Sequence, residues 1–177
     1  APVNLWKTED AQKLLKCYNV VDYVTMPNPG QVWSYIGGWL YQAHLKEIED
    51  NVPEQLRSYY NSCALRMSIA LSSFGKDLKN EAGAELSGDK ANAGALGGKT
   101  HVIIRARDMA AYVQKLLGDP DYADGQDTGY CSPQPGDIIV FAGKGHAGMC
   151  PGDNISIGSF LTGPIWLINR ATLKDAE

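Results

Sequence analysis

Residues 61–71 of the chain, NSCALRMSIAL, decide the fold, because they place a cysteine at the expected start of an apolar helix. Asn61 and Ser62 are residue types that cap helices, since a side-chain oxygen there accepts hydrogen bonds from the free N–H groups of the first turn. The positive end of the helix dipole favours the thiolate of Cys63 over the thiol. The thiolate is the form that acts as a nucleophile. The alternative is that Cys63 is a small buried apolar residue, the usual fate of a free cysteine.

A histidine follows in a second segment that carries strand and turn signals. Residues 135–141, PGDIIVF, predict a turn followed by an apolar strand. The glycine-rich turn AGKG at 142–145 leads into a second strand, which begins at His146 and ends at the PGDN turn of residues 151–154. A histidine beside a glycine turn at the start of a strand lies at a sheet edge, where a cleft can reach it. A cysteine on an early helix and a histidine on a later strand is the order of papain-like hydrolases.

Three motifs occur in a characteristic order: WSYIGG at 33–38, NSCALRMS at 61–68 and GHA at 145–147. In this order they resemble the type VI secretion amidase effectors of family 4, which belong to the NlpC/P60 group of papain-like peptidoglycan amidases. The PGD sequence at 135–137 also resembles that wider group. The resemblance covers most of the chain, and the cysteine motif is its most specific part.

The resemblance implies an α+β, papain-like fold of the NlpC/P60 type, in which the nucleophile helix packs on an antiparallel sheet. It also implies an antibacterial cysteine amidase that hydrolyses the D-glutamyl–meso-diaminopimelate bond of peptidoglycan stem peptides. Such a protein is made in the cytoplasm of the producer and delivered by the type VI system into the target-cell periplasm, and a cognate immunity protein blocks its cleft. Two alternatives stay open. One is a housekeeping or secreted NlpC/P60 cell-wall hydrolase, and the other is a non-catalytic binding module with Cys63 in its core.

The expected mechanism gives each candidate residue a role. Cys63 attacks an amide carbonyl, and His146 takes the sulfur proton and passes it to the leaving amine. The backbone N–H of Cys63 at the helix start is a candidate donor to the oxyanion. In the family that the chain resembles, an acid that orients the imidazole follows the histidine, and the candidates here are Asp153, Asn154 and Ser156. Asp153 is the acid closest after His146 in sequence, and we predict that it is the third catalytic residue.

Length and composition predict one globular domain over residues 1–177, with 44% hydrophobic and 20% charged residues. The net charge is −4 and no basic cluster occurs, which argues against a nucleic-acid partner. No apolar run approaches the roughly 20 residues that span a bilayer.

Metal and cofactor sites are not expected. The sequence has no Cys-x-x-Cys or His-x-x-x-His pair, and the glycines of residues 94–98 lack the Gly-Lys-Ser/Thr ending of a phosphate-binding loop. The other two histidines, His44 and His101, lack the turn and strand context of His146. We interpret both as ordinary surface or core residues.

The remaining cysteines, Cys17, Cys131 and Cys150, are too few for a disulfide scaffold in a chain of this length. Cys131 precedes one predicted strand and Cys150 ends the next, so a bridge between them is one alternative. The other, which is slightly favoured, is that all three are buried thiols.

Hydrophobic periodicity and turn residues outline the other elements. Helices are predicted from Thr8, at 53–56, from Cys63 to about Ser73 with a stop at Gly75, and at 107–117. The glycines at 37–38 predict a close backbone approach or a bend. Loops are expected at 26–30 and, as a long surface segment that could also form a wall of the substrate groove, at 76–100. Predicted strands lie at 137–141, 146–150, 155–159 and 165–168.

Overall fold

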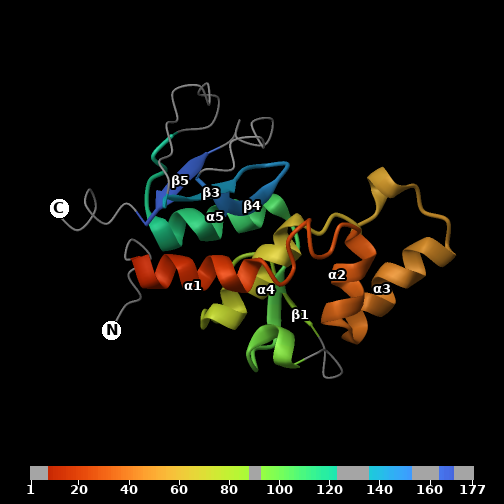
Figure 1. The fold of residues 1–177 in the computed structure, drawn as a ribbon. Helices are drawn as coiled ribbons and strands as arrows, with labels where there is room; N and C mark the ends of the chain where they lie inside the picture. Colours follow the sequence, from red (N-terminus) through yellow and green to blue (C-terminus); the bar gives the residue numbers. More distant parts are fainter. Residues whose placement is uncertain (1–7, 88–92, 123–135, 153–163, 170–177) are drawn as a thin grey trace.

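The structure, a computed structural model, describes residues 8–87, 93–122, 136–152 and 164–169. Its α-helices are α1 (Thr8–Tyr18), α2 (Pro29–Ile36), α3 (Gly38–Glu49), α4 (Cys63–Phe74) and α5 (Ala106–Leu117), with short 3-10 turns η1 (Glu54–Leu56) and η2 (Ala93–Leu96). Its strands are β1 (Ala84–Leu86), β2 (His101–Ile103), β3 (Ile138–Ala142), β4 (Ala147–Pro151) and β5 (Ile165–Ile168). The three-stranded sheet lies at one end of the molecule and α2 and α3 at the other, with α4 between them (Figure 1).

Helix α4 is the centre of the fold. It contacts α1, α5, β4, β2 and η2, and every residue from Cys63 to Ser72 is buried. Met67 and Leu71 face a core cluster shared with α1, α5 and the three-stranded sheet, whereas Leu65 and Ile69 face a second cluster shared with α2 and β2. Because both faces of α4 are covered, its sequence is apolar all round. The predicted helix ends as expected at Gly75, whose φ of 127° suits a residue without a side chain.

The main sheet is antiparallel with the strand order β4-β3-β5. Strand β3 alternates between two cores: Ile138 and Val140 face the helices, and Ile139 and Phe141 face the opposite side of the sheet. In the hairpin, Ala142 pairs with Ala147 and Ile138 pairs with Pro151. The predicted α+β fold with the nucleophile helix on an antiparallel sheet is thus confirmed. The strand predicted at 155–159 lies outside the described residues.

The prediction of a surface loop over 76–100 is wrong in part. β1 pairs with β2 in a small antiparallel sheet, and Leu78 and Leu96 are fully buried. These elements are only three or four residues long, so they contain too few residues to show a hydrophobic period. The small sheet is fixed to α4 through Ser68, whose hydroxyl donates to the Ile103 carbonyl (2.8 Å) and accepts from the Ile103 N–H (2.9 Å).

Two predictions concern the segment before α4. The bend expected at 37–38 is confirmed, because α2 ends there and Gly37 adopts a φ of 65° that favours glycine. The loop expected at 26–30 ends earlier than predicted, since α2 begins at Pro29. Proline suits the first position of a helix, and the Asn28 N–H donates to the Gln31 side chain at 2.8 Å. A proline in a loop-like sequence therefore marked a helix start.

Candidate active site

Cys63 is the first residue of α4, and its side chain is only 1% exposed. The predicted capping is made by Asn61, whose Oδ1 accepts a hydrogen bond from the Cys63 N–H at 3.1 Å. Ser62 occupies the N-cap position but makes no capping bond. Its hydroxyl instead accepts from Nε of Arg66 at 2.9 Å. The N–H predicted as an oxyanion donor is thus engaged by Asn61 in this structure.

The predicted preference of Cys63 for the thiolate is wrong for the protein as it stands. Burial raises the pKa of the Cys63 thiol, because a thiolate in this position would lose its hydration. Neighbouring backbone groups and the positive charge of Arg66 favour the thiolate, but they do not offset this cost. The resting form is therefore the thiol, which needs a base before it can attack.

His146 lies immediately before β4 and is half-buried. Its ring lies between two aromatic rings, with centroid distances of 5.2 Å to Phe141 and 5.9 Å to Tyr23. Burial lowers the pKa of His146, and the positive charge of Arg66 lowers it further. The imidazole is therefore neutral at neutral pH, which is the form that can accept a proton.

The start of α4 and the start of β4 meet at these two residues. Cys63 and Ala147, the neighbour of His146 in the chain, belong to the same buried core cluster, and α4 packs against β4. Gly148 permits the close packing beside them: a Cβ at this position would lie 2.8 Å from Cζ of Phe141 and 3.0 Å from the Tyr18 hydroxyl. The structure therefore brings the predicted nucleophile and the predicted base to one place.

The third predicted residue, Asp153, lies outside the described residues, as do its alternatives Asn154 and Ser156. The described part of the hairpin ends at Gly152, whose N–H donates to the Asp137 carbonyl at 2.7 Å. Cys131, which could form a disulfide bridge with Cys150, also lies outside the described residues.

The other histidines have structural surroundings. His44 is buried, its Nδ1 lies 2.6 Å from the Tyr59 carbonyl, and its ring stacks on Trp33 at 5.8 Å. His101 is half-buried on β2, with Nδ1 at 2.8 Å from the Thr100 hydroxyl. These contacts agree with the interpretation of both as ordinary residues.

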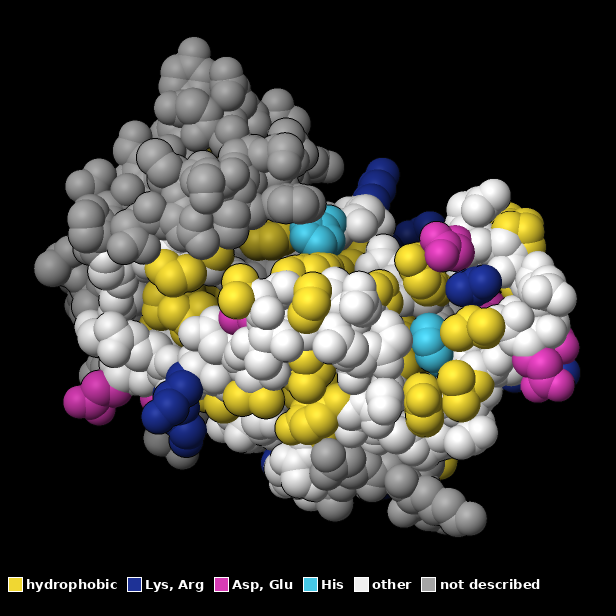
Figure 2. Space-filling view, turned by 45° about the vertical axis from the view of Figure 1, so that its right-hand side comes forward, with side chains coloured by type: hydrophobic (Ala, Val, Ile, Leu, Met, Phe, Trp, Pro, Cys, Tyr) yellow, Lys and Arg dark blue, Asp and Glu magenta, His cyan; other side chains and the backbone are white. Residues whose placement is uncertain are grey.

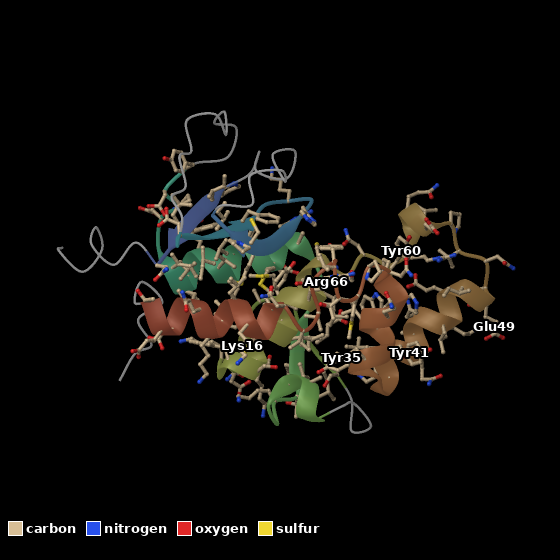
Figure 3. The ribbon with its side chains drawn as sticks, in the orientation of Figure 1. Lys16, Tyr35, Tyr41, Glu49, Tyr60 and Arg66 are labelled. Carbon is tan, nitrogen blue, oxygen red and sulfur yellow. The ribbon has the colours of Figure 1, made fainter. Side chains whose placement is uncertain are left out.

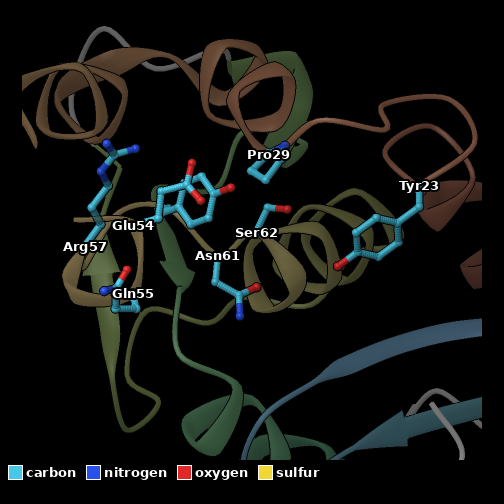
Figure 4. Close-up of a pocket in the computed structure, with 8 residues that line it drawn as sticks. Tyr23, Pro29, Glu54, Gln55, Arg57, Asn61 and Ser62 are labelled. Carbon is cyan, nitrogen blue, oxygen red and sulfur yellow. The ribbon is translucent and has the colours of Figure 1, made fainter. Parts of the chain in front are cut away.

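Two pockets adjoin the site. The apolar pocket, of about 420 Å³, is lined among others by Tyr18, Tyr23, Val24, Phe141, His146 and Met149. The polar pocket, of about 470 Å³, is lined by Tyr23 together with Glu54, Arg57, Tyr60, Asn61 and Ser62 among others. Figure 4 shows Asn61 and Ser62 between Tyr23 on one side and Gln55 and Arg57 on the other. On the face shown in Figure 2, hydrophobic side chains form a band across the molecule with a histidine at its upper margin.

Sequence reasoning missed Tyr23 and Arg66. Tyr23 borders both pockets, but it lies in a loop without any pattern that marks a function. Arg66 left a signal, since it is a cation in the middle of an apolar helix, and this signal was not used.

Across 8–87, 93–122, 136–152 and 164–169, no group of three or more His, Cys, Asp or Glu residues could hold a metal ion. Within the part of the chain that the structure describes, no helix is both long and apolar enough to cross a membrane.

The fold resembles those of solved effector structures. The crystal structure of the type VI effector Tae4 from Enterobacter cloacae has a TM-score of 0.54 and 20% identity, and the match covers 95% of this chain and 99% of that one. The Tae4–Tai4 effector–immunity complex from Salmonella Typhimurium has a TM-score of 0.54 and 21% identity, covering 89% of this chain and 92% of that one. The chain therefore has the papain-like, NlpC/P60-type fold of these proteins.

The family follows from the sequence match. The model described as "Type VI secretion system (T6SS), amidase effector protein 4", or Tae4, matches residues 59–153, which is more than half of the chain. The chain belongs to the Tae4 family of type VI secretion amidase effectors. A search of curated proteins found no match.

Proposed function

We propose that this chain is an antibacterial amidase that cleaves the D-glutamyl–meso-diaminopimelate bond of peptidoglycan stem peptides with Cys63 as nucleophile and His146 as base. Membership of the amidase effector family supports the class of reaction. The observation that carries the mechanism is the packing of α4 on β4, because it sets Ala147, the residue next to His146, in the same buried cluster as Cys63.

The resting pair is a neutral thiol and a neutral imidazole, as the directions of the two pKa shifts require. His146 takes the proton from the Cys63 sulfur as the sulfur attacks the amide carbonyl, so a C–S bond forms and the carbonyl oxygen becomes an oxyanion. The Cys63 N–H can donate to that oxygen once the Asn61 side chain releases it.

The imidazolium formed in this step then serves as the acid. It gives its proton to the amide nitrogen, the C–N bond breaks and the amine leaves, which creates a thioester on Cys63. Water, deprotonated by His146, attacks the thioester carbon. The C–S bond breaks, the carboxylic acid leaves and the proton returns to the sulfur.

We expect the two pockets, both of which Tyr23 lines, to hold the substrate peptide on the two sides of the bond that is cut. Apolar side chains line one pocket, and the other carries Arg57 and Glu54. A stem peptide is branched and charged, so it offers groups of both kinds.

Digestion of purified peptidoglycan tests this function. Incubation with cell walls of the meso-diaminopimelate type should release peptides that start with a free diaminopimelate amine. The disaccharides that remain should carry a stem peptide that ends at D-glutamate, and mass analysis identifies both products. Cell walls with lysine at the third position serve as the matched control. Release of fragments cut at the sugar–peptide amide would contradict the proposed bond. Binding to cell walls without release would favour the binding-module alternative.

A protein partner is part of the proposal. The solved Tae4 structures from Enterobacter cloacae and Salmonella Typhimurium include complexes with the immunity protein Tai4. We propose by analogy that a cognate immunity protein binds this chain. The effector would be made in the producer cytoplasm and act in the periplasm of the target cell, as membership of a type VI effector family suggests.

We further propose that Asp153 orients His146, as the order of the motifs suggests. A carboxylate stabilises the imidazolium better than an amide does, because a charge-assisted hydrogen bond is stronger. We expect Asp153→Asn to lower kcat by roughly 10- to 1,000-fold while the melting temperature changes little.

Two further variants serve as the comparison for Asp153. Asn154→Ala and Ser156→Ala remove the two alternative partners of the imidazole. If Asp153→Asn retains normal turnover and one of the other two loses it, Asp153 is a turn residue and the assignment moves to that neighbour.

A further inference from the structure

Arg66 is a buried cation on α4, the helix that begins at Cys63. It follows Cys63 by one helical turn in α4, and its side chain is fully buried. Figure 3 shows it near the centre of the molecule. A buried charge is costly unless it is well paired. No carboxylate forms a salt bridge with Arg66 among the described residues, so its partners have to be found elsewhere.

The partners of Arg66 lie in the loop that joins α1 to α2. Nη1 donates to the carbonyls of Val21 (2.8 Å) and Met26 (2.6 Å). These two carbonyls stand before and after Tyr23 in the chain. The guanidinium itself lies over the Tyr23 ring, 3.8 Å from its centroid. Arg66 therefore fixes this loop on both sides of Tyr23 and fixes the ring as well.

Tyr23 connects this anchor to the candidate active site. Its ring is 5.9 Å from the His146 ring, and it lines the polar pocket together with Ser62, the residue before Cys63. It also borders both the apolar and the polar pocket. The side chain is nevertheless 42% exposed, so the protein core does not require a tyrosine there.

We propose that Tyr23, held on Arg66, is a positioning and specificity-determining residue: its ring separates the two pockets and keeps the His146 imidazole turned toward Cys63. This inference rests on the proposed amidase function and adds to it the residue that divides the substrate between the pockets. Arg66 acts through Tyr23 and through the loop that carries it.

The electrostatic surroundings are consistent with this role. The charged and titratable groups around Arg66 are Asp22, Tyr18 and Tyr23 from the first part of the chain, Cys63 from its own helix, and His146 before β4. Burial raises the pKa of Cys63, and the positive charge of Arg66 opposes that rise; burial lowers the pKa of His146, and the same charge lowers it further. Because Arg66 is fully buried and its removal would strip several bonds from the core, the exposed Tyr23 is the better residue to test.

The test compares three variants of the full chain. Tyr23→Leu removes the ring, and Tyr23→Phe keeps the ring but removes the hydroxyl. Trp39→Leu is the matched control, because Trp39 is also 42% exposed but lies on α3 and lines neither pocket. Two quantities are measured for each: kcat and KM on a soluble muropeptide, and the rate of alkylation of Cys63 by iodoacetamide as a function of pH.

We expect Tyr23→Leu to lower kcat by roughly 10- to 100-fold and to change KM, since small misplacements of reacting groups have effects of this size. In the same variant, the rate of Cys63 alkylation plotted against pH should lose the step that reports deprotonation of His146. Trp39→Leu should keep both, and Tyr23→Phe should lose much less than Tyr23→Leu because it keeps the ring. Unchanged kinetics and profile in Tyr23→Leu would overturn the proposal, and so would a loss in Tyr23→Phe as large as that in Tyr23→Leu.

The alkylation measurement needs no substrate. If the unmodified protein hydrolyses no muropeptide, the amidase function is wrong, but the alkylation profiles of the three variants still decide whether Tyr23 positions His146 against Cys63.

Discussion

Cys63→Ala should fold normally and hydrolyse no peptidoglycan. Loss of the nucleophile in a hydrolase of this type costs on the order of 10⁴-fold or more in kcat, because the residual stabilisation from binding groups cannot replace the covalent step. The substitution removes one atom from a buried site, so the free energy of unfolding should fall by only about 1 kcal/mol. Cell-wall digestion followed by mass analysis and thermal melting measure the two effects.

Cys63→Ser and Cys17→Ala complete this experiment. Serine has a much more basic oxygen in place of the sulfur, so it should also be inactive. Cys17 is a half-buried free cysteine on α1 that lines none of the pockets around the site, so Cys17→Ala should keep full activity. Hydrolysis by a folded Cys63→Ala protein would end the cysteine-amidase proposal.

The helices were predictable where a strong local pattern existed. Helix α5 and the end of α4 at Gly75 follow from apolar spacing and a terminal glycine, and the structure confirms both. Helix α2 was not predicted, because the proline at its start is as typical of a loop as of the first turn of a helix. The short elements within residues 76–100 were missed because their burial depends on contacts with α4 and not on local sequence.

The candidate site divides in the same way. The choice of Cys63 and His146 rests on local sequence context, and their catalytic roles stay predictions; the structure packs α4, which begins at Cys63, against β4, which follows His146. The state of the thiol was predicted wrongly, because the helix dipole is visible in the sequence whereas the depth of burial is not. Arg66 and Tyr23 depend on bonds between residues about 45 positions apart, such as that from Arg66 to Val21, and a single sequence carries no direct record of such pairs.

Replacement of His146 by alanine should be the second most damaging change. General base catalysis by a positioned imidazole contributes roughly 10²- to 10⁴-fold, and the buried thiol of Cys63 depends on that base because its own pKa is raised. Burial lowers the pKa of His146, so the neutral, proton-accepting form persists to lower pH than in an ordinary histidine. The acid-side fall of kcat/KM in the unmodified protein should therefore lie below about pH 6.5, the usual histidine value.

His44→Ala and His101→Ala separate this role from that of histidines in general. His44 is buried and bonded to the Tyr59 carbonyl, so its loss should lower the melting temperature by removing a hydrogen bond worth about 0.5–1.5 kcal/mol and a ring stacked on Trp33. His101 bonds only to the adjacent Thr100 side chain among the contacts described, so its loss should have a smaller effect. Both variants should keep kcat, because neither residue lines the two pockets beside Cys63. If a folded His44→Ala or His101→Ala protein loses hydrolysis while His146→Ala keeps it, the base lies elsewhere and the start of β4 is not the catalytic edge.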